Sequence, residues 1–309
     1  MVRSAGLALA MALDAALRDP ATLHPVAGLG RIAHVAERRL YRPTRAAGAL
    51  YAAALVVPPA ALALGLDRRA GRGASLMLTA ACAWTALGGA SLRRIALQMA
   101  DLVDAGDLTA ARALARSLVA RRTGDLDGAE LSRAALESLA ENTSDAVGGP
   151  IVWTAAAGPA GAVAHRTVNT LDAMVGYRDG RYERFGWASA RLDDLINWPV
   201  ARATAAATVG AAALCGEDPA GAVRVWRHDG ARHPSPNAGR VEAAFAGALG
   251  VRLGGTNLYG DRAETRPPLG DGRWPDTVAL RRGVRLSATA SWLLAAAAVG
   301  VTAAVCAWR

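Results

Sequence analysis

The sequence predicts an all-α integral membrane protein, and three observations support this fold class. Of the 309 residues, 52% are hydrophobic and only 20% are charged, whereas soluble domains carry about 25% charged residues. The apolar residues gather in long blocks, and no alternation of apolar and polar residues typical of strands is sustained. This composition argues against a disordered chain, a collagen-like repeat and a disulfide-rich scaffold.

Three uncharged blocks reach the roughly 20 residues that a membrane-spanning helix needs. These blocks are 46–66, 73–92 and 286–308. Three weaker candidates contain a charge, a proline or Gly-Pro pairs: 6–17, 146–164 and 195–216. We therefore expect four to six membrane-embedded segments in a single domain over 1–309, with a broken or re-entrant helix within 146–164. Polar helices are expected over 96–121 and 129–142.

The N-terminal block follows Arg3 and resembles the apolar core of a signal peptide. Asp14 lies within it, however, and no convincing small-residue cleavage site follows. We expect this helix to remain in the protein and to carry Asp14 towards a polar site. The arginine-rich segments 18–45 and 217–285 predict a multi-pass protein of the cytoplasmic membrane with its motif-bearing loops on the cytoplasmic side.

Every one of the 35 basic residues is arginine. The absence of lysine excludes a Walker A loop, a Schiff-base lysine and a kinase-type lysine. Any bound phosphate must then be held by arginine, backbone N–H groups or a metal. The net charge of +9 does not indicate a nucleic-acid partner, because the arginines flank apolar blocks and would contact anionic lipid headgroups. Three cysteines lie in apolar blocks without a Cys-x-x-Cys pair, which favours buried small hydrophobes over zinc or redox chemistry.

A series of acidic residues precedes the broken apolar block. Glu130, Arg133, Glu137 and Glu141 recur at i, i+3, i+7 and i+11 on one helical face, and Asp145 follows. One interpretation is a solvated ladder in which Arg133 pairs with Glu137 and Glu130. The other is a Mg²⁺ site, because this ion takes one or two carboxylates together with substrate phosphates. The predicted metal-binding residues are Glu137, Glu141, Asp145 and Asp193.

Three further polar stretches contain residue types suited to catalysis or phosphate binding. They comprise the turn around His24-Pro25, the segment 169–197, and the segment 233–239 followed by Glu242, 254–257 and Tyr259-Gly260. The predicted catalytic residues are Asp172, Asp194, Arg191 and His233. The predicted substrate- or phosphate-binding residues are Asn169, Arg178, Asn197, Ser235, Asn237, His24 and Asp14. Capping, turn chemistry and surface ion pairs are the alternative roles, and Ser235 has no triad order that would make it a nucleophile.

The succession of these motifs resembles the CobD/CbiB family of cobalamin biosynthesis proteins, the adenosylcobinamide-phosphate synthases. The resemblance runs from about residue 11 to residue 270, and its most specific strings are Asn169-Thr170-Leu171-Asp172 and the seven residues His233–Gly239. It implies ATP- and Mg²⁺-dependent amide formation between adenosylcobyric acid and aminopropanol or its phosphate, which gives adenosylcobinamide or its phosphate. It also implies contact with the lipid bilayer and with other membrane enzymes of the pathway.

Two other classes of function remain open. A membrane transporter or permease would explain the helices, Asp14 and the broken segment near Gly148 and Pro159. It would have short loops, whereas the polar segments 165–194 and 217–285 are long. The third class is a non-catalytic membrane scaffold for enzymes that act on corrinoids.

Overall fold

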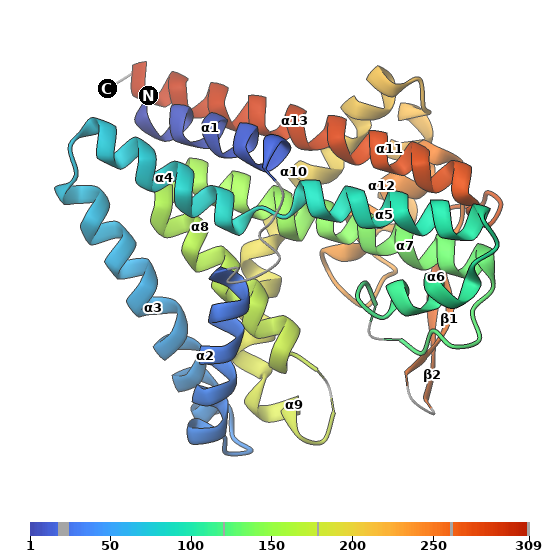
Figure 1. Ribbon diagram of the computed structural model, residues 1–309, viewed down its shortest axis with the longest axis horizontal. Helices are drawn as coiled ribbons and strands as arrows, with labels where there is room; N and C mark the ends of the chain where they lie inside the picture. Colours follow the sequence, from blue (N-terminus) through green and yellow to red (C-terminus); the bar gives the residue numbers. More distant parts are fainter. Residues whose placement is uncertain (18–24, 120, 178, 260–261, 308–309) are drawn as a thin grey trace. The chain divides into compact units, whose positions relative to one another are not determined.

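The structure is a computed structural model that describes residues 1–17, 25–119, 121–177, 179–259 and 262–307. Helices form most of this part of the chain, which confirms the helical fold class (Figure 1). The elements are α1 (Val2–Ala16), α2 (Pro25–Leu40), α3 (Arg45–Arg69), α4 (Arg72–Ala86), α5 (Gly89–Asp104), α6 (Leu108–Ala115), α7 (Gly128–Asn142), the π-helix η1 (Thr143–Gly148), α8 (Gly149–Val175), α9 (Tyr182–Phe185), α10 (Trp187–Cys215), α11 (Pro219–Asp229), α12 (Ala238–Leu249), β1 (Leu253–Tyr259), β2 (Arg262–Leu269) and α13 (Thr277–Ala307).

The chain divides into two units, each with its own packed interior. Unit 1 comprises Met1–Gly88, Asp145–Val200 and Ala295–Arg309, and unit 2 comprises Gly89–Ser144 and Ala201–Leu294. Helices α10 and α13 therefore contribute residues to both units. The single membrane domain expected over 1–309 stays a prediction.

Unit 1 is helical, with α1 packed against α4 and α3 against α8 (Figure 1). Its interior includes Tyr51, Leu171 and Phe185, and the ring centroids of Tyr51 and Phe185 lie 5.0 Å apart. The break predicted within 146–164 is present in α8. Gly158 has a φ of +65°, a left-handed conformation that glycine adopts without strain, and Pro159 has no N–H to continue the helical hydrogen bonds.

Unit 2 carries α7, α11 and α12 around an apolar interior. Helix α7 begins with a capping box in which Asp127 and Glu130 each accept the backbone N–H of the other. Helices α11 and α12 approach closely because Gly221 meets Gly247, where an added Cβ would lie only 2.2 Å from the Gly221 carbonyl oxygen. The expected helix over 96–121 is divided into α5 and α6 at Gly106, whose φ is +73°.

The all-α expectation is wrong at one place, where β1 and β2 form an antiparallel hairpin in unit 2. The register shifts between Leu253 and Gly255, so the side chains do not alternate regularly. Gly254 and Gly255 both have positive φ, at 88° and 91°, and Pro267 and Pro268 lie in β2. Glycine and proline are depleted in strands, which explains why the sequence pattern did not predict the hairpin.

Three helical stretches in the described chain are long and apolar enough to cross a membrane: 45–69, 72–104 and 277–304. The first and third contain the predicted blocks 46–66 and most of 286–308. The second covers 73–92, but the helix is interrupted at Leu87 and Gly88, where the Gly88 N–H donates to the Ala146 carbonyl oxygen at 3.1 Å. Helix α4 alone has 15 residues, about 22 Å, which is shorter than the ~30 Å hydrocarbon core.

The weaker segments 6–17, 146–164 and 195–216 lie in α1, in η1 with α8, and in α10, and the count of four to six stays a prediction. We expect the protein to sediment with membranes and to resist extraction with alkaline carbonate, because the apolar helices α3 and α13 would lose favourable burial in water. Immunoblotting of fractionated cells measures this. Recovery of the chain in the soluble fraction would contradict a membrane-spanning fold.

Candidate functional site

Glu137 on α7 is the centre of a buried polar cluster in unit 2. Its carboxylate accepts a hydrogen bond from the Arg121 guanidinium at 3.0 Å, from Arg133 at 3.4 Å and from the Gly254 N–H at 2.9 Å. Arg121 also donates to the Asn257 side chain, and Arg133 donates to the Gly254 carbonyl oxygen. We call these five residues the Glu137 cluster.

The ion pairs of the Glu137 cluster are buried, in contrast to the solvated ladder considered above. The side chains of Arg121, Arg133 and Glu137 are each less than 10% exposed. The predicted pairing of Arg133 with Glu137 is present, but Glu130 accepts the Asp127 N–H at the start of α7 instead. Because a buried charge without its counter-charge is costly, the cluster fixes the hairpin onto α7.

His233 lies beside this cluster in the loop between α11 and α12. An added Cβ on Gly239 would lie 2.2 Å from the His233 Cβ, so glycine is required there for the start of α12 to pack on His233. The Ser235 N–H donates to His233 Nδ1 at 3.0 Å, and because this bond is shorter than the contact of Arg266 with Nε2, we assign the proton of the neutral ring to Nε2. That Nε2 lies 3.8 Å from Glu242 Oε1 and 3.4 Å from the Arg266 guanidinium.

Burial shifts the proton affinities around His233. It raises the pKa of Glu242 well above its ordinary value, and the neighbouring carboxylates Glu137 and Glu141 raise it further. The pKa of Glu141 is also raised, by burial and by Glu137, against the opposing effect of Arg266. Burial and the nearby Arg266 lower the pKa of His233 to about 4. His233 is therefore neutral at physiological pH and presents an N–H donor at Nε2.

The raised pKa of Glu242 predicts a pH-dependent difference between the wild-type protein and Glu242→Gln. The neutral carboxyl stabilises the native state below its ordinary pKa of 4.5, and this stabilisation is lost as the pH rises towards the folded pKa. Glutamine does not ionise, so we expect similar melting temperatures at pH 4 and a more stable variant at pH 8 and above. Thermal unfolding in detergent across pH measures the difference, and Glu264→Gln, at a more exposed carboxylate, is the control. Parallel curves for Glu242→Gln and wild type would contradict the raised pKa.

Ser235 and Asn237 lie in the same loop as His233. The Ser235 Oγ accepts the N–H groups of Asn237 and Ala238 at 3.3 and 3.2 Å, which caps the start of α12. Asn237 is buried, with 5% of its surface exposed. The loop therefore holds His233, Ser235 and Asn237 close together, and the Ser235 oxygen has a structural role there.

A second polar cluster lies in unit 1, between α8 and the first half of α10. His165 Nε2 and Asn197 Oδ1 are 2.8 Å apart, and the Asn169 amide donates to Asp193 at 3.5 Å. Arg166 donates to the Asn169 side-chain oxygen at 3.4 Å. The structure thus brings together the predicted residues Asn169, Asp193 and Asn197, and adds His165 and Arg166.

The other predicted residues of unit 1 occupy different surroundings. Asp14 is buried on α1, Asp145 lies in η1 and Asp172 is half-buried near the end of α8. Arg191 lies 3.7 Å from Asp194, with side chains 65% and 33% exposed, which is the geometry of a surface ion pair. His24 and Arg178 lie outside the described residues.

No three histidine, cysteine or acidic residues of the described chain come together as a preformed metal centre. Of the predicted metal-binding residues, Glu137 and Glu141 belong to unit 2, and Asp145 and Asp193 belong to unit 1. Both oxygens of Glu137 are already engaged by arginine or backbone donors. Glu141 is half-buried, whereas Glu137 and Glu242 are buried.

Sequence reasoning missed Arg121 and Arg266, and it noted Glu242 and Asn257 without giving either a role. Arg121 and Arg266 lie outside the motifs considered above. Asn257 follows the Gly254-Gly255 pair, which by itself is weak evidence for a functional site. The available signal for the hairpin was the Gly254-Gly255 pair, which allows the backbone to approach Glu137 closely.

The fold and the two clusters define a helical protein with membrane-length helices and a buried site of carboxylates, arginines and a neutral histidine. A sequence model of the family described as CobD/Cbib protein matches residues 7–287. The cobalamin biosynthesis protein CobD of Mycobacterium tuberculosis is 50% identical over 285 residues, which cover 92% of this chain and 91% of that protein. The protein of the same name from Pelobacter propionicus is 43% identical, over 86% of this chain and 84% of that protein. The one from Geobacter metallireducens is 42% identical, over 95% of each chain.

The chain therefore belongs to the CobD/CbiB family, and its role is in cobalamin biosynthesis. This confirms the resemblance found in the motifs. No solved structure matches the chain.

Proposed function

We propose that this protein is an ATP-dependent ligase that joins adenosylcobyric acid to aminopropanol or aminopropanol phosphate through an amide bond. The product is adenosylcobinamide or its phosphate. The observation that carries the proposal is the site in unit 2, where the family's loop from His233 to Gly239 lies against a set of buried carboxylates and arginines. Family membership over 7–287 supports the choice of substrates.

The reaction requires activation of a carboxylate, because a carboxylate anion does not react with an amine. In the proposed sequence, an oxygen of the corrinoid carboxylate attacks the terminal phosphorus of ATP, forming a C–O–P bond and releasing ADP. The amine then attacks the acyl carbon, the C–N bond forms and inorganic phosphate leaves. The ammonium proton must pass to a base, so atoms and charge balance.

The residues of unit 2 supply groups suited to these steps. The Nε2–H of neutral His233 is a hydrogen-bond donor for a phosphoryl or carbonyl oxygen on which negative charge develops. Arg266, 3.4 Å from that nitrogen, adds positive charge. The phosphate that leaves in the second step can accept the amine proton, so no side chain of unit 2 has to take it.

We propose that Mg²⁺ arrives with ATP as part of the substrate. Such ions take one or two protein carboxylates together with phosphate oxygens, so a preformed three-ligand centre is not required. Glu141 fits this role better than Glu137, whose oxygens are engaged by arginine. Asp145 and Asp193 in unit 1 remain proposed ligands. When bound, the ion would neutralise charge on the phosphates.

We further propose a multi-pass location in the cytoplasmic membrane with the motif-bearing loops facing the cytoplasm, where ATP is available. The three apolar stretches support a membrane location. The arginine-rich segments 18–45 and 217–285 support the sidedness.

The test is reconstitution. Protein purified in detergent is given adenosylcobyric acid, aminopropanol or its phosphate, and MgATP, and products are identified by mass spectrometry together with release of ADP or AMP. Formation of the amide with one of the two amines, dependent on ATP, is the expected result. Corrinoid binding without turnover would favour the scaffold, and corrinoid uptake into sealed vesicles without amide formation would favour the transporter.

Arg191 offers a further test of the phosphate-binding residues. If the Arg191 guanidinium makes a bidentate contact with a phosphate group, an ammonium group cannot replace it. Arg191→Lys should then raise the KM for ATP or the aminoalkyl phosphate tenfold or more, which corresponds to about 1.4 kcal/mol. Steady-state kinetics with each substrate varied measures this. The exposed pair with Asp194 keeps its charge in this variant, so near-normal KM and kcat would leave Arg191 with a surface role only.

A further inference from the structure

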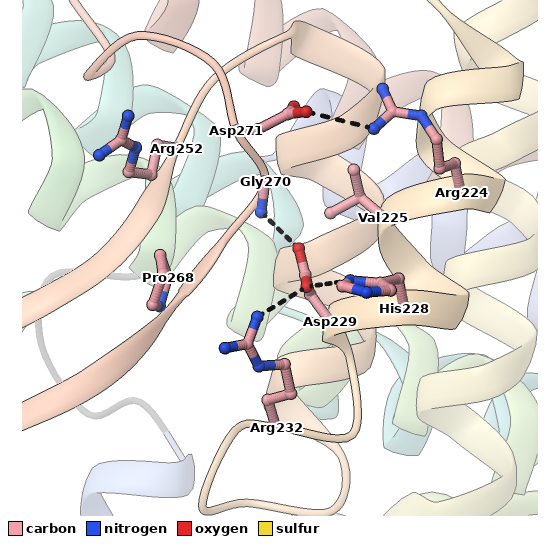
Figure 2. Close-up of a pocket in the computed structure, with 9 residues that line it drawn as sticks. All are labelled: Arg224, Val225, His228, Asp229, Arg232, Arg252, Pro268, Gly270 and Asp271. Atoms are coloured by element: carbon pink, nitrogen blue, oxygen red, sulfur yellow. Dashed lines mark hydrogen bonds and ion pairs between the residues drawn. The ribbon is translucent and has the colours of Figure 1, made fainter.

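A pocket of about 510 Å³ lies in unit 2, and its lining includes none of the residues assigned to ligation. It is formed by the second half of α11, by Arg232 in the loop that follows, by Arg252 just before β1, and by the end of β2 with the two residues after it. Its size is in the range of small-molecule sites. Figure 2 shows Arg224 and Arg252 on either side of Asp229, with Arg232 below it. Basic side chains outnumber acidic ones in its lining: Arg224, His228, Arg232 and Arg252 against Asp229 and Asp271.

Asp229 organises the pocket and contributes little free negative charge to it. One of its oxygens accepts from His228 Nδ1 at 2.7 Å and from Arg232 at 3.2 Å, and the other accepts the Gly270 N–H at 2.9 Å (Figure 2). These donors hold the pKa of Asp229 below its ordinary value, although burial alone would raise it. The carboxylate thus positions Arg232 and His228 at the wall of the pocket.

Arg224 is held much more weakly. It lies 3.5 Å from Asp271, and the two side chains are 61% and 84% exposed. An exposed pair of this kind contributes little to stability, because water and salt screen the two charges. A ligand with several negative charges can displace the Asp271 carboxylate and gain two-pronged contacts with arginine.

We propose that this pocket binds the phosphate groups of a phosphorylated small molecule. Arginine is the residue best matched to phosphate oxygens, and it is the only basic residue besides histidine that this chain contains. The end of α11 places about half a negative elementary charge near the pocket, and the charge of the three arginines that line it is larger. Phosphate binding in this pocket does not depend on the amide-forming reaction, so this proposal goes beyond the proposed function.

The experiment measures binding of inorganic tripolyphosphate to the full-length protein in uncharged detergent by isothermal titration calorimetry. We expect Arg224→Gln and Arg232→Gln each to weaken binding about tenfold, which corresponds to about 1.4 kcal/mol. Arg227→Gln is the matched control, because Arg227 is exposed on the same helix, loses the same charge and does not line the pocket. Asp271→Asn should strengthen binding several-fold, since it removes the carboxylate that competes for Arg224.

Further arms separate the sources of phosphate. ATP, aminopropanol phosphate and phosphatidylglycerol vesicles are each tested as competitors of tripolyphosphate, with citrate as a carboxylate polyanion of similar charge. Equal binding by Arg224→Gln, Arg232→Gln and Arg227→Gln, or citrate binding as tight as tripolyphosphate, would overturn the proposal. If the pocket binds phosphate and no amide forms in reconstitution, the proposed function fails while this site stands. If the amide forms but Arg224→Gln and Arg232→Gln bind tripolyphosphate as tightly as the wild type, the pocket proposal fails while the proposed function stands.

Discussion

Glu137→Ala is expected to destabilise the protein by about 3–5 kcal/mol, because it leaves two buried guanidinium groups without their carboxylate. Arg121 and Arg133 both donate to Glu137, and neither side chain can reach water without movement of the hairpin. The Gly254 N–H would also lose its acceptor. Denaturant unfolding in detergent, followed by circular dichroism, measures the change. Glu137→Gln keeps the size of the side chain but not its charge, and we expect a loss smaller than that of alanine.

The matched control for this prediction is Glu130→Ala on the same helix. Glu130 caps the exposed start of α7 and pairs with no buried arginine in the described chain, so its loss should cost roughly 1 kcal/mol or less. A Glu137 variant that is no less stable than the Glu130 variant would show that the cluster contributes little to folding. The hydrogen bonds to Glu137 would then contribute less to stability than hydrogen bonds to charged groups usually do in proteins.

Asp172→Ala is expected to reduce amide formation at least 100-fold, about 2.7 kcal/mol in activation free energy, while the protein still inserts into the membrane. Asp172 belongs to the Asn169–Asp172 string and lies on α8 one turn from Asn169. The Asn169 amide contacts Asp193, so the Asp172 carboxylate lies close to the polar cluster of unit 1. Asp194→Ala should have a similar effect, because Asp172 and Asp194 are both among the catalytic residues predicted in unit 1. Turnover in the reconstituted assay and membrane fractionation are measured together.

Glu183→Ala serves as the control for both aspartates, because Glu183 is an exposed acid on the short helix α9 of the same unit. It removes the same charge and should leave turnover within twofold. Full activity in both Asp172→Ala and Asp194→Ala would refute the catalytic assignment of the acidic set. If either variant fails to insert into the membrane, its loss of turnover reflects misfolding. Asp172→Asn keeps the shape of the side chain, so its turnover then shows whether the carboxylate charge itself is required.

The local parts of the site could be predicted from sequence spacing. The i, i+4 spacing of Arg133 and Glu137 places them on one helical face, and the structure confirms that they pair. The prolines around Ser235 predict a fixed loop, and the structure describes one that ends in a cap for α12. Both features depend on residues within a few positions of one another, so backbone geometry alone decides them.

The long-range parts could not be predicted in this way. Arg121 and Gly254 reach Glu137 from 16 and 117 positions away, and no periodicity specifies such meetings. The interruption of the apolar stretch 72–104 has the same origin. Apolar composition extends without a break from 73 to 92, but the helix ends where the Gly88 N–H meets the Ala146 carbonyl oxygen. Tertiary hydrogen bonds therefore decide what local propensity leaves open.

The double engagement of Gly254 has a consequence for local motion. Its N–H donates to Glu137 and its carbonyl oxygen accepts from Arg133, so one peptide segment of β1 joins both halves of an ion pair on α7. That amide can exchange its hydrogen with solvent only when the hairpin leaves α7 and the buried charges become hydrated. Hydrogen-exchange protection at Gly254 therefore measures the free energy of opening this cluster directly, separately from the global unfolding of either unit.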